Sequence, residues 1–144
     1  MQLTLHTDYS FRVLIYLYVN RPRPATVGEI SEYYGVSRHH LLKVVNNLAH
    51  KGMVETVRGK GGGVRLLDHV LEMSAGEILR QLEDSKPLVN CTGGEKTPKC
   101  AVLPICRFNI VLNDALSRFF EELDGYRLQD LVVTEVPLER TSSL

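Results

Sequence analysis

The strongest constraint on this 144-residue chain is that its three cysteines all lie within sixteen positions, from Cys91 to Cys106. Free cysteine is usually a scattered, buried residue, so this clustering needs a chemical reason. The segment between them is rich in Gly, Pro and Thr, which disfavours continuous helix or strand. An apolar stripe at helical spacing starts near Cys106, and a helix dipole favours negatively charged thiolates at its N-terminus. The segment therefore predicts a metal or iron–sulfur site.

The spacing of the cysteines separates the candidate ligands. Gaps of eight and five residues divide Cys91, Cys100 and Cys106, and no histidine follows His69. Structural zinc sites typically pair cysteines two to four residues apart, so zinc is disfavoured, although it stays an alternative. A disulfide would leave one of the three thiols unpaired. A cluster usually has four protein ligands, so we favour a cluster with a fourth, non-cysteine ligand, and keep structural or redox thiols as the alternative.

Charge is distributed unevenly along the chain. The overall net charge is zero, yet residues 21–65 carry +5 and residues 66–144 carry −5. A basic first half is typical of a surface that binds a polyanion, and nucleic acid is the obvious candidate. The sequence has no apolar run long enough for a membrane helix and no N-terminal signal peptide. Together with clustered reduced thiols, this indicates a cytoplasmic protein without a membrane partner.

The first helix is predicted over residues 7–20. Thr7 is the expected N-cap, and Asp8 falls in the first turn, where the helix dipole favours a carboxylate. Apolar residues at helical spacing predict the buried face, and they are Phe11, Leu14, Ile15 and Tyr18.

A helix-turn-helix motif is predicted at about residues 28–51. Thr26 and Glu29 form a capping box before a short helix that stops at Gly35. A second helix is expected to start after Ser37 and to end near Lys51, with an apolar side made of Leu41, Leu42, Val44, Val45 and Leu48. The N-terminal residues of such a second helix reach base edges in the major groove. The residues expected at the DNA are Thr26, Ser37, Arg38, His39, His40 and Lys43.

A β-hairpin with a basic, glycine-rich tip is predicted at about residues 53–67. The tip lacks the spacing of a phosphate-binding loop, so a wing that follows the helix-turn-helix motif is the better interpretation. Its residues expected at phosphates or in the minor groove are Arg58, Lys60, Gly62 and Arg65. The fold class is therefore mainly α, a winged helix-turn-helix.

The second half supplies a short helix, the cysteine segment and one long helix. Ser74 and Glu77 form another capping box, and Pro87 is expected to end that helix. The stripe from Cys106 to Asp124 predicts a helix longer than a small winged domain can cover, which indicates a two-fold dimer. We predict a DNA-binding domain at 1–84, a cluster loop at 85–106, a dimerisation helix at 107–126 and a tail at 127–144.

Short motifs along nearly the whole chain carry a family resemblance. They are Met1-Gln-Leu-Thr, Thr7-Asp-Tyr9, Tyr34-Gly-Val-Ser-Arg38, Val57-Arg-Gly-Lys60 with Gly62-Gly63, Leu88-Val-Asn-Cys91 and Glu122-Leu-Asp124. With these motifs the chain resembles the IscR-like iron–sulfur winged-helix regulators. The similarity is greatest to the nitric-oxide-sensing repressors of that family.

The resemblance implies a homodimer that represses transcription at a palindromic operator in double-stranded DNA. It implies that Cys91, Cys100 and Cys106 hold an iron–sulfur cluster, with [4Fe-4S] favoured over [2Fe-2S]. Asp8 matches the position whose carboxylate completes the cluster from the partner subunit, and His6 is a weaker alternative. Cluster-biogenesis members use a histidine where this chain has Asn109.

The resemblance further implies that nitric oxide attacks the cluster and relieves repression of nitrosative-stress genes. The wide first cysteine gap is similar to that of iron-responsive members, so an iron or redox signal is an alternative. A zinc- or thiol-based winged-helix regulator and a protein-binding adaptor are further alternatives. The sequence has no nucleophile–base pair and no paired-carboxylate site, so we do not expect an enzyme.

Overall fold

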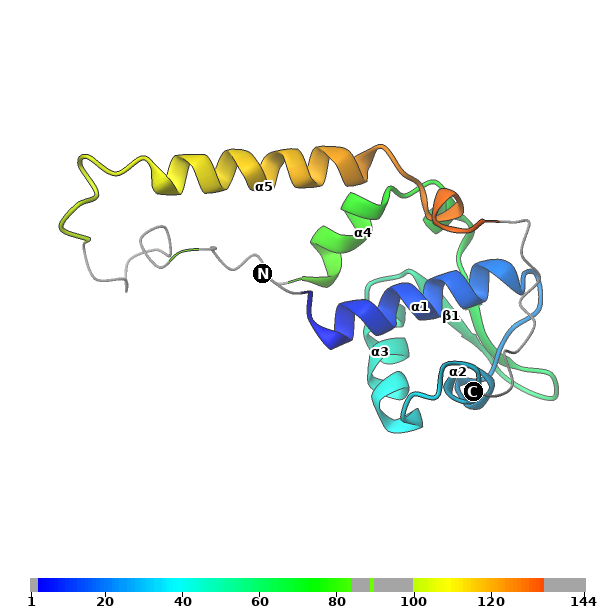
Figure 1. Ribbon diagram of the computed structural model, residues 1–144. Coiled ribbons are helices and arrows are strands. Elements are labelled where there is room, and N and C mark those ends of the chain that lie inside the picture. The colour runs from blue at the N-terminus through cyan, green and yellow to red at the C-terminus, as the bar shows by residue number, and fades with distance from the viewer. Residues whose placement is uncertain (1–2, 84–88, 90–99, 134–144) are drawn as a thin grey trace, which may run out of the picture.

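The computed structural model describes residues 3–83, 89 and 100–133 (Figure 1). The helices and strands of the first half are α1 (Leu5–Val19), α2 (Val27–Tyr34), α3 (Arg38–His50), β1 (Val54–Val57) and β2 (Gly63–Leu66). They are followed by η1 (Asp68–Leu71), α4 (Ala75–Leu82), α5 (Phe108–Asp124) and η3 (Leu128–Leu131), where η1 and η3 are short 3₁₀ helices. No helix within these described ranges has the length and apolar content needed to cross a membrane.

Helix α1 begins earlier than its sequence predicts. Thr4 is the N-cap, and its hydroxyl accepts a hydrogen bond of 3.2 Å from the backbone N–H of Thr7. The prediction of Thr7 as the cap is therefore wrong, because Leu5 and His6 extend the helix by a further half-turn and leave Thr7 fully buried. Asp8 lies in the first turn, as predicted.

The buried face of α1 is also shifted. Val13, Leu14 and Leu17 are at most 2% exposed, whereas the predicted residues Phe11, Ile15 and Tyr18 are partly buried at the edges of the core, so only Leu14 was placed correctly. The reason is that α1 packs against α3, β2, α4 and η3 at once, so it is covered on more than one side. Figure 1 shows α1 running through the middle of the domain.

The helix-turn-helix motif forms as predicted. The Glu29 N–H donates to the Thr26 hydroxyl (3.1 Å), and the Thr26 N–H donates to the Glu29 carboxylate (2.6 Å). Gly35 adopts the left-handed conformation (φ 63°) that ends α2 and that favours glycine. Ser37 is the N-cap of α3, but its hydroxyl makes no capping hydrogen bond. The helix buries Leu41, Val44, Val45 and Leu48, whereas Leu42 is 41% exposed and was wrongly assigned to the apolar side.

Strands β1 and β2 pair antiparallel, with Val54 opposite Leu66 and Val57 opposite Gly63. The chain before α2 joins this hairpin, because Ala25 exchanges two backbone hydrogen bonds of 2.9 and 2.8 Å with Val64. A Cβ atom at Gly63 would lie 2.6 Å from the Ala25 carbonyl oxygen, so this close approach requires glycine. The hairpin is thereby fastened to the helix-turn-helix motif.

Helix α5 extends away from the domain, above α4 in Figure 1. It starts at Phe108, two residues later than predicted, and contains no buried residue. Beneath it, α4 has the predicted Ser74–Glu77 capping box but ends at Leu82; Pro87, its predicted end, lies outside the described residues. After α5 the chain forms η3, whose Leu128 is fully buried. The tail from residue 134 onward also lies outside the described residues.

Candidate nucleic-acid interface and cysteine segment

The first two turns of α3 present four predicted DNA-contacting residues to solvent. Arg38, His39, His40 and Lys43 are all exposed, because the opposite side of the helix is held in the core. The His39 and His40 rings lie 6.3 Å apart, centroid to centroid. A helix held by one side, with cationic and hydrogen-bonding side chains on the other, has the arrangement that major-groove recognition needs.

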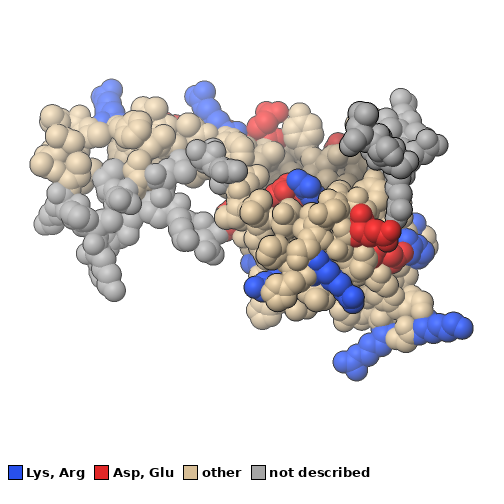
Figure 2. Space-filling model, turned by 60° about the horizontal axis from the view of Figure 1, so that its bottom comes forward, with Lys and Arg blue, Asp and Glu red and all other residues tan. Residues whose placement is uncertain are grey.

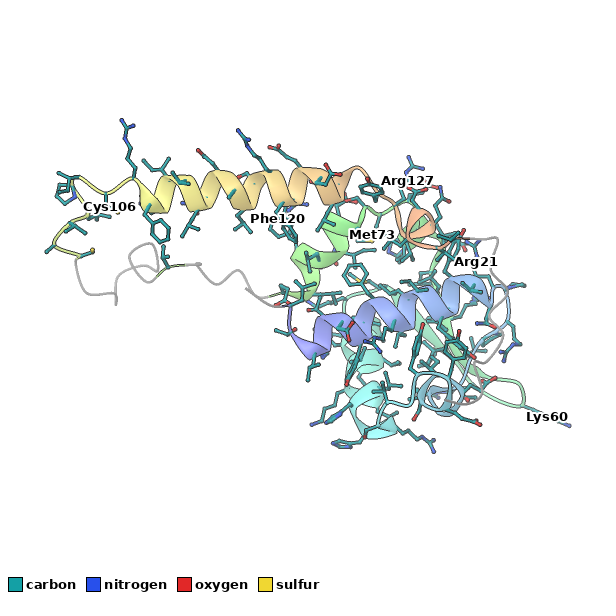
Figure 3. All side chains as sticks on the ribbon, viewed as in Figure 1. Arg21, Lys60, Met73, Cys106, Phe120 and Arg127 are labelled. Atoms are coloured by element: carbon teal, nitrogen blue, oxygen red, sulfur yellow. The ribbon has the colours of Figure 1, made fainter. Side chains whose placement is uncertain are left out.

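The wing carries Arg58 and Lys60 at its exposed tip, and Figure 3 shows Lys60 projecting from it. Gly59 and Gly61 have φ values of 99° and 79°, which favour glycine in this turn. A Cβ atom at Gly62 would lie 2.2 Å from the Val57 carbonyl oxygen. Gly62, which we predicted at the DNA, is therefore required by the turn itself.

Arg65, the fourth predicted wing residue, is held by an acidic neighbour. It lies opposite Glu55 in the strand register, and its Nε donates to Glu55 Oε1 over 2.9 Å. This hydrogen bond and the nearby negative charge raise the pKa of Arg65. Arg23 is held in the same way by Glu29, 2.7 Å away. The net positive charge of residues 21–65 thus overstates the positive charge that is free for phosphates.

Lysine and arginine side chains are spread over the face that comes forward in Figure 2, and the farthest of them extend from a lobe at the lower right. Thr26 lies exposed at the start of α2, with its hydroxyl used for capping. Ser37 is exposed at the start of α3. The tip of the wing and the exposed side of α3 thus belong to one domain. The pairing of Ala25 with Val64 joins the hairpin to the segment that leads into the helix-turn-helix motif.

Two of the three cysteines lie in the described residues. Cys100 is exposed and Cys106 half-buried, and both are free thiols. A series of turns connects them, with the Leu103 N–H donating to the Cys100 carbonyl (3.1 Å). Cys106 lies two residues before α5, at the end of the helix that is remote from the domain (Figure 3). Cys106 therefore lies near the N-terminus of α5, as predicted, whereas Cys100 lies eight residues before the helix; Cys91 lies outside the described residues.

Asp8, the predicted fourth ligand, is half-buried in the first turn of α1. It forms an ion pair with Arg12, one helical turn away, with Arg12 Nη2 2.8 Å from Asp8 Oδ2. The alternative ligand, His6, lines a cavity of about 150 Å³ between α1 and α3, together with Tyr9, His40 and Lys43. Arg12 was not among the predicted site residues, although its spacing of four residues from Asp8 is the usual one for a helical ion pair.

Within the described residues of one chain, no group of three or more His, Cys, Asp or Glu side chains is placed to hold a metal ion. The chemistry of the donor set nevertheless suits an iron–sulfur cluster. Cys100 and Cys106 are free and close in the chain, and Asp8 is a half-buried carboxylate on another helix.

Comparisons with known proteins decide the class. The family model described as "Rrf2: Iron-dependent Transcriptional regulator" matches residues 3–134. The chain belongs to the Rrf2 family. It is 43% identical over 133 residues to the HTH-type transcriptional regulator NsrR of Bacillus subtilis, covering 92% of this chain and 90% of that one. It is also 43% identical over 136 residues to NsrR of Bacillus licheniformis, covering 94% of each.

Solved structures agree with the assignment to the Rrf2 family. CymR, described as the global cysteine regulator of B. subtilis, has a TM-score of 0.68 at 26% identity, covering 91% of this chain and 95% of that chain. T. potens IscR has a TM-score of 0.71 at 23% identity, covering 91% and 85%, which shows a shared fold. The predicted winged-helix fold is confirmed, and this Rrf2 protein is a DNA-binding transcriptional regulator rather than an enzyme.

Proposed function

We propose that this Rrf2 protein is a homodimeric repressor whose binding to a palindromic operator is controlled by an iron–sulfur cluster that responds to nitric oxide. One observation carries the proposal. Helix α5 holds Cys100 and Cys106 away from the domain of their own chain, and the described part of that chain brings no third metal-binding side chain to them. With Cys91 of the same chain as the third ligand, the fourth ligand would come from a second subunit.

The exposed face of α5 supplies the means of dimerisation. Phe108, Ile110 and Val111 are each more than half exposed, and no residue of the helix is buried. Exposed apolar surface of this kind marks an interaction site, and a two-fold axis would place the same face of two copies together. In such a dimer the cysteines of one subunit can approach Asp8 of the other. The domain division at residues 84, 106 and 126 is part of this proposal.

The ligands we assign are Cys91, Cys100 and Cys106 of one subunit and Asp8 of the second subunit. When bound, the cluster supplies iron that reacts with nitric oxide. Asp8 joins α1 of one subunit to α5 of the other, and the two recognition helices are thereby kept about one DNA turn apart. Carboxylate is a weaker donor to iron than thiolate, so Asp8 would be the ligand held least tightly. Without that bond the two recognition helices would no longer be kept at this spacing, and operator affinity would fall, because the two states differ in their affinity for DNA.

The family name and the relatives' names support iron and NsrR-like regulation, and they leave the type of cluster open between [4Fe-4S] and [2Fe-2S]. The experiment is a titration of anaerobically purified protein with nitric oxide, following visible absorption and operator binding together. We expect brown protein that loses absorption and operator affinity over the same range of nitric oxide. Colourless, zinc-loaded protein that binds its operator fully would instead support a zinc or thiol regulator. Loss of binding on iron depletion alone would favour the iron-responsive alternative.

A further inference from the structure

Helix α5 depends on its C-terminal end for its attachment to the domain. No residue along the helix is buried, and among the described elements it packs mainly against α4 (Figure 1). A helix of this length spans about 25 Å, so a small rotation at one end produces a large displacement at the other. Whatever fixes the last turn of α5 therefore fixes the position of the whole helix.

Asp124, the last residue of α5, is the centre of this attachment. Its Oδ1 accepts hydrogen bonds from Arg80 Nη1 (2.7 Å) and Ser74 Oγ (3.1 Å), and its Oδ2 accepts one from Arg80 Nη2 (2.7 Å). Ser74 caps the start of α4 and Arg80 lies in its last turn, so one carboxylate spans the helix. A two-point contact of guanidinium with carboxylate fixes orientation as well as distance. These hydrogen bonds, above all those from Arg80, lower the pKa of Asp124.

The aromatic ring of Phe120 completes the contact from one turn earlier in α5. The Arg80 guanidinium carbon lies 4.4 Å from the centroid of this ring, which is a favourable cation–π distance. Figure 3 shows Phe120 on the side of α5 that faces α4. Arg80 of α4 thus contacts both the Phe120 ring and the Asp124 carboxylate, which belong to α5.

The first turn of α4 has room for the Asp124 carboxylate because residue 76 is glycine. A Cβ atom on Gly76 would lie 2.0 Å from Asp124 Oδ1 and 2.9 Å from its Cγ. Gly76 has no positive φ that would require glycine, and glycine is less favourable than alanine within a helix by about 1 kcal/mol. Its presence in the first turn of α4 is explained by the close approach of Asp124.

Backbone pairing continues the attachment beyond α5. The Ala75 N–H donates to the Tyr126 carbonyl (2.7 Å), and the Leu128 N–H donates to the Met73 carbonyl (3.3 Å). Leu128 is fully buried in the core. The residues after α5 are therefore anchored to the domain, and Asp124 lies where this anchored segment meets the freely extending helix.

We propose that Asp124 is a positioning residue for DNA binding, which fixes the angle between the dimerisation helix and the winged domain and so sets the half-site spacing that the dimer accepts. The inference rests on the proposed dimer. A rotation of about 10° at Asp124 would displace the far end of α5 by about 4 Å, which exceeds the ~3.4 Å rise of one base-pair step. The Asp124 and Arg80 side chains are 38% and 44% exposed, and exposed ion pairs contribute little to stability. Their effect on geometry can therefore be separated from folding.

The test uses full-length, anaerobically purified protein with two variants, Asp124→Asn and Gly76→Ala. Glu121→Gln is the matched control, because it also removes one carboxylate from the last turns of α5 but lies outside these contacts. The DNA probe is a palindrome that the wild-type protein selects from a random duplex library. Binding is measured to that palindrome, to its single half-site, and to versions with the half-sites moved by one base pair in either direction.

We expect both variants to remain dimeric and to bind the half-site like the wild type. Their affinity for the selected palindrome should fall by roughly tenfold, and their preference for its spacing over the shifted versions should shrink, while Glu121→Gln behaves as the wild type. In an Asp124→Ala background, Gly76→Ala should cause no further change, because the carboxylate that it displaces is gone.

Two results would overturn the inference. One is an unchanged spacing preference in Asp124→Asn; the other is an equal loss on palindrome and half-site, which would show that Asp124 only supports the winged domain. Failure of the proposed function has a different signature, because the wild-type protein would then select no palindrome or bind the half-site equally well. That outcome removes the dimeric model and this inference with it.

Discussion

The Asp8 carboxylate lies against the guanidinium of Arg12, with Oδ1 3.2 Å from Nε and Oδ2 2.8 Å from Nη2. The Arg12 guanidinium also lies over the rings of Tyr9 and Tyr34, and the Tyr34 hydroxyl donates to the Arg12 carbonyl (3.0 Å). Burial raises the pKa of Tyr34 to about 12, so this donor stays protonated. Arg12 therefore links Asp8 to the end of α2, next to the turn at Gly35.

The ion pair does not prevent Asp8 from serving as a ligand. Both side chains are more than 40% exposed, and exposed pairs are worth about 0–1 kcal/mol. In the proposed dimer a bond to iron would exceed this, so Asp8 would exchange Arg12 for the cluster of the second subunit. On release from that cluster, the carboxylate would find Arg12 as its partner again.

The first prediction concerns Asp8→Ala. The variant should still take up a cluster through its cysteines but lose visible absorption to a chelator faster, by roughly tenfold or more, because the carboxylate ligand is missing. Asp68→Ala, which removes an exposed carboxylate elsewhere, is the control. Equal rates of loss in the two variants would show that Asp8 is no ligand.

The second prediction concerns Arg38→Ala. Arg38 is exposed in the first turn of α3, so its removal should weaken binding to the operator by about 1–3 kcal/mol and relax specificity at the base pair that it contacts. Fluorescence anisotropy with the operator and with an unrelated duplex provides the measurement. An equal loss on both duplexes would contradict a base contact and indicate a phosphate contact instead.

The third prediction compares two cations of the wing. Lys60→Ala should weaken binding to all sequences alike and reduce the slope of log K against log salt by about one unit. Arg65→Ala should change this slope less, because Glu55 already neutralises the Arg65 guanidinium. Binding isotherms at several salt concentrations measure both slopes. A larger change for Arg65→Ala would mean that the pair with Glu55 opens on DNA.

The fourth prediction concerns the dependence of stability on pH through Glu83. Its carboxylate accepts hydrogen bonds from the Thr4 N–H (2.9 Å) and the Thr4 hydroxyl (3.1 Å), and contacts with Thr7 and Thr4 lower its pKa. Because the pKa is lower in the folded state, the stabilisation is fully present above the ordinary value of 4.5 and is lost as pH falls below it. Urea unfolding should show Glu83→Gln less stable at neutral pH by under about 1 kcal/mol, since the group is largely accessible.

The difference between Glu83→Gln and the wild type should then shrink as pH falls through the lowered pKa of Glu83. Glu121→Gln, which alters another exposed carboxylate, serves as the reference for general charge effects. A difference that stays constant down to pH 3 would show that the contact with Thr4 does not depend on the charge of Glu83.

Local signals in the sequence predicted most of the elements. Thr26 with Glu29 and Ser74 with Glu77 fixed two helix starts, and Gly35 fixed a helix end, because each acts within one turn of backbone. The glycines around Lys60 predicted the wing for the same reason. Thr7 was wrongly predicted as a helix cap and Leu42 as a buried residue. Both depend on which side chains are buried, and burial is decided by neighbours that are distant in sequence.

The sequence by itself determined that the chain has a winged helix-turn-helix motif, clustered thiols at a helix start and a long amphipathic helix, since helical spacing, caps and turn residues act over short range. Only the tertiary structure decided that Glu55 holds Arg65, that Arg12 holds Asp8 and that Asp124 fastens α5 across α4. A hydrogen bond or ion pair depends on separations of a few ångströms between side chains. Residues 50 positions apart, such as Ser74 and Asp124, reach that separation only when the whole domain has packed.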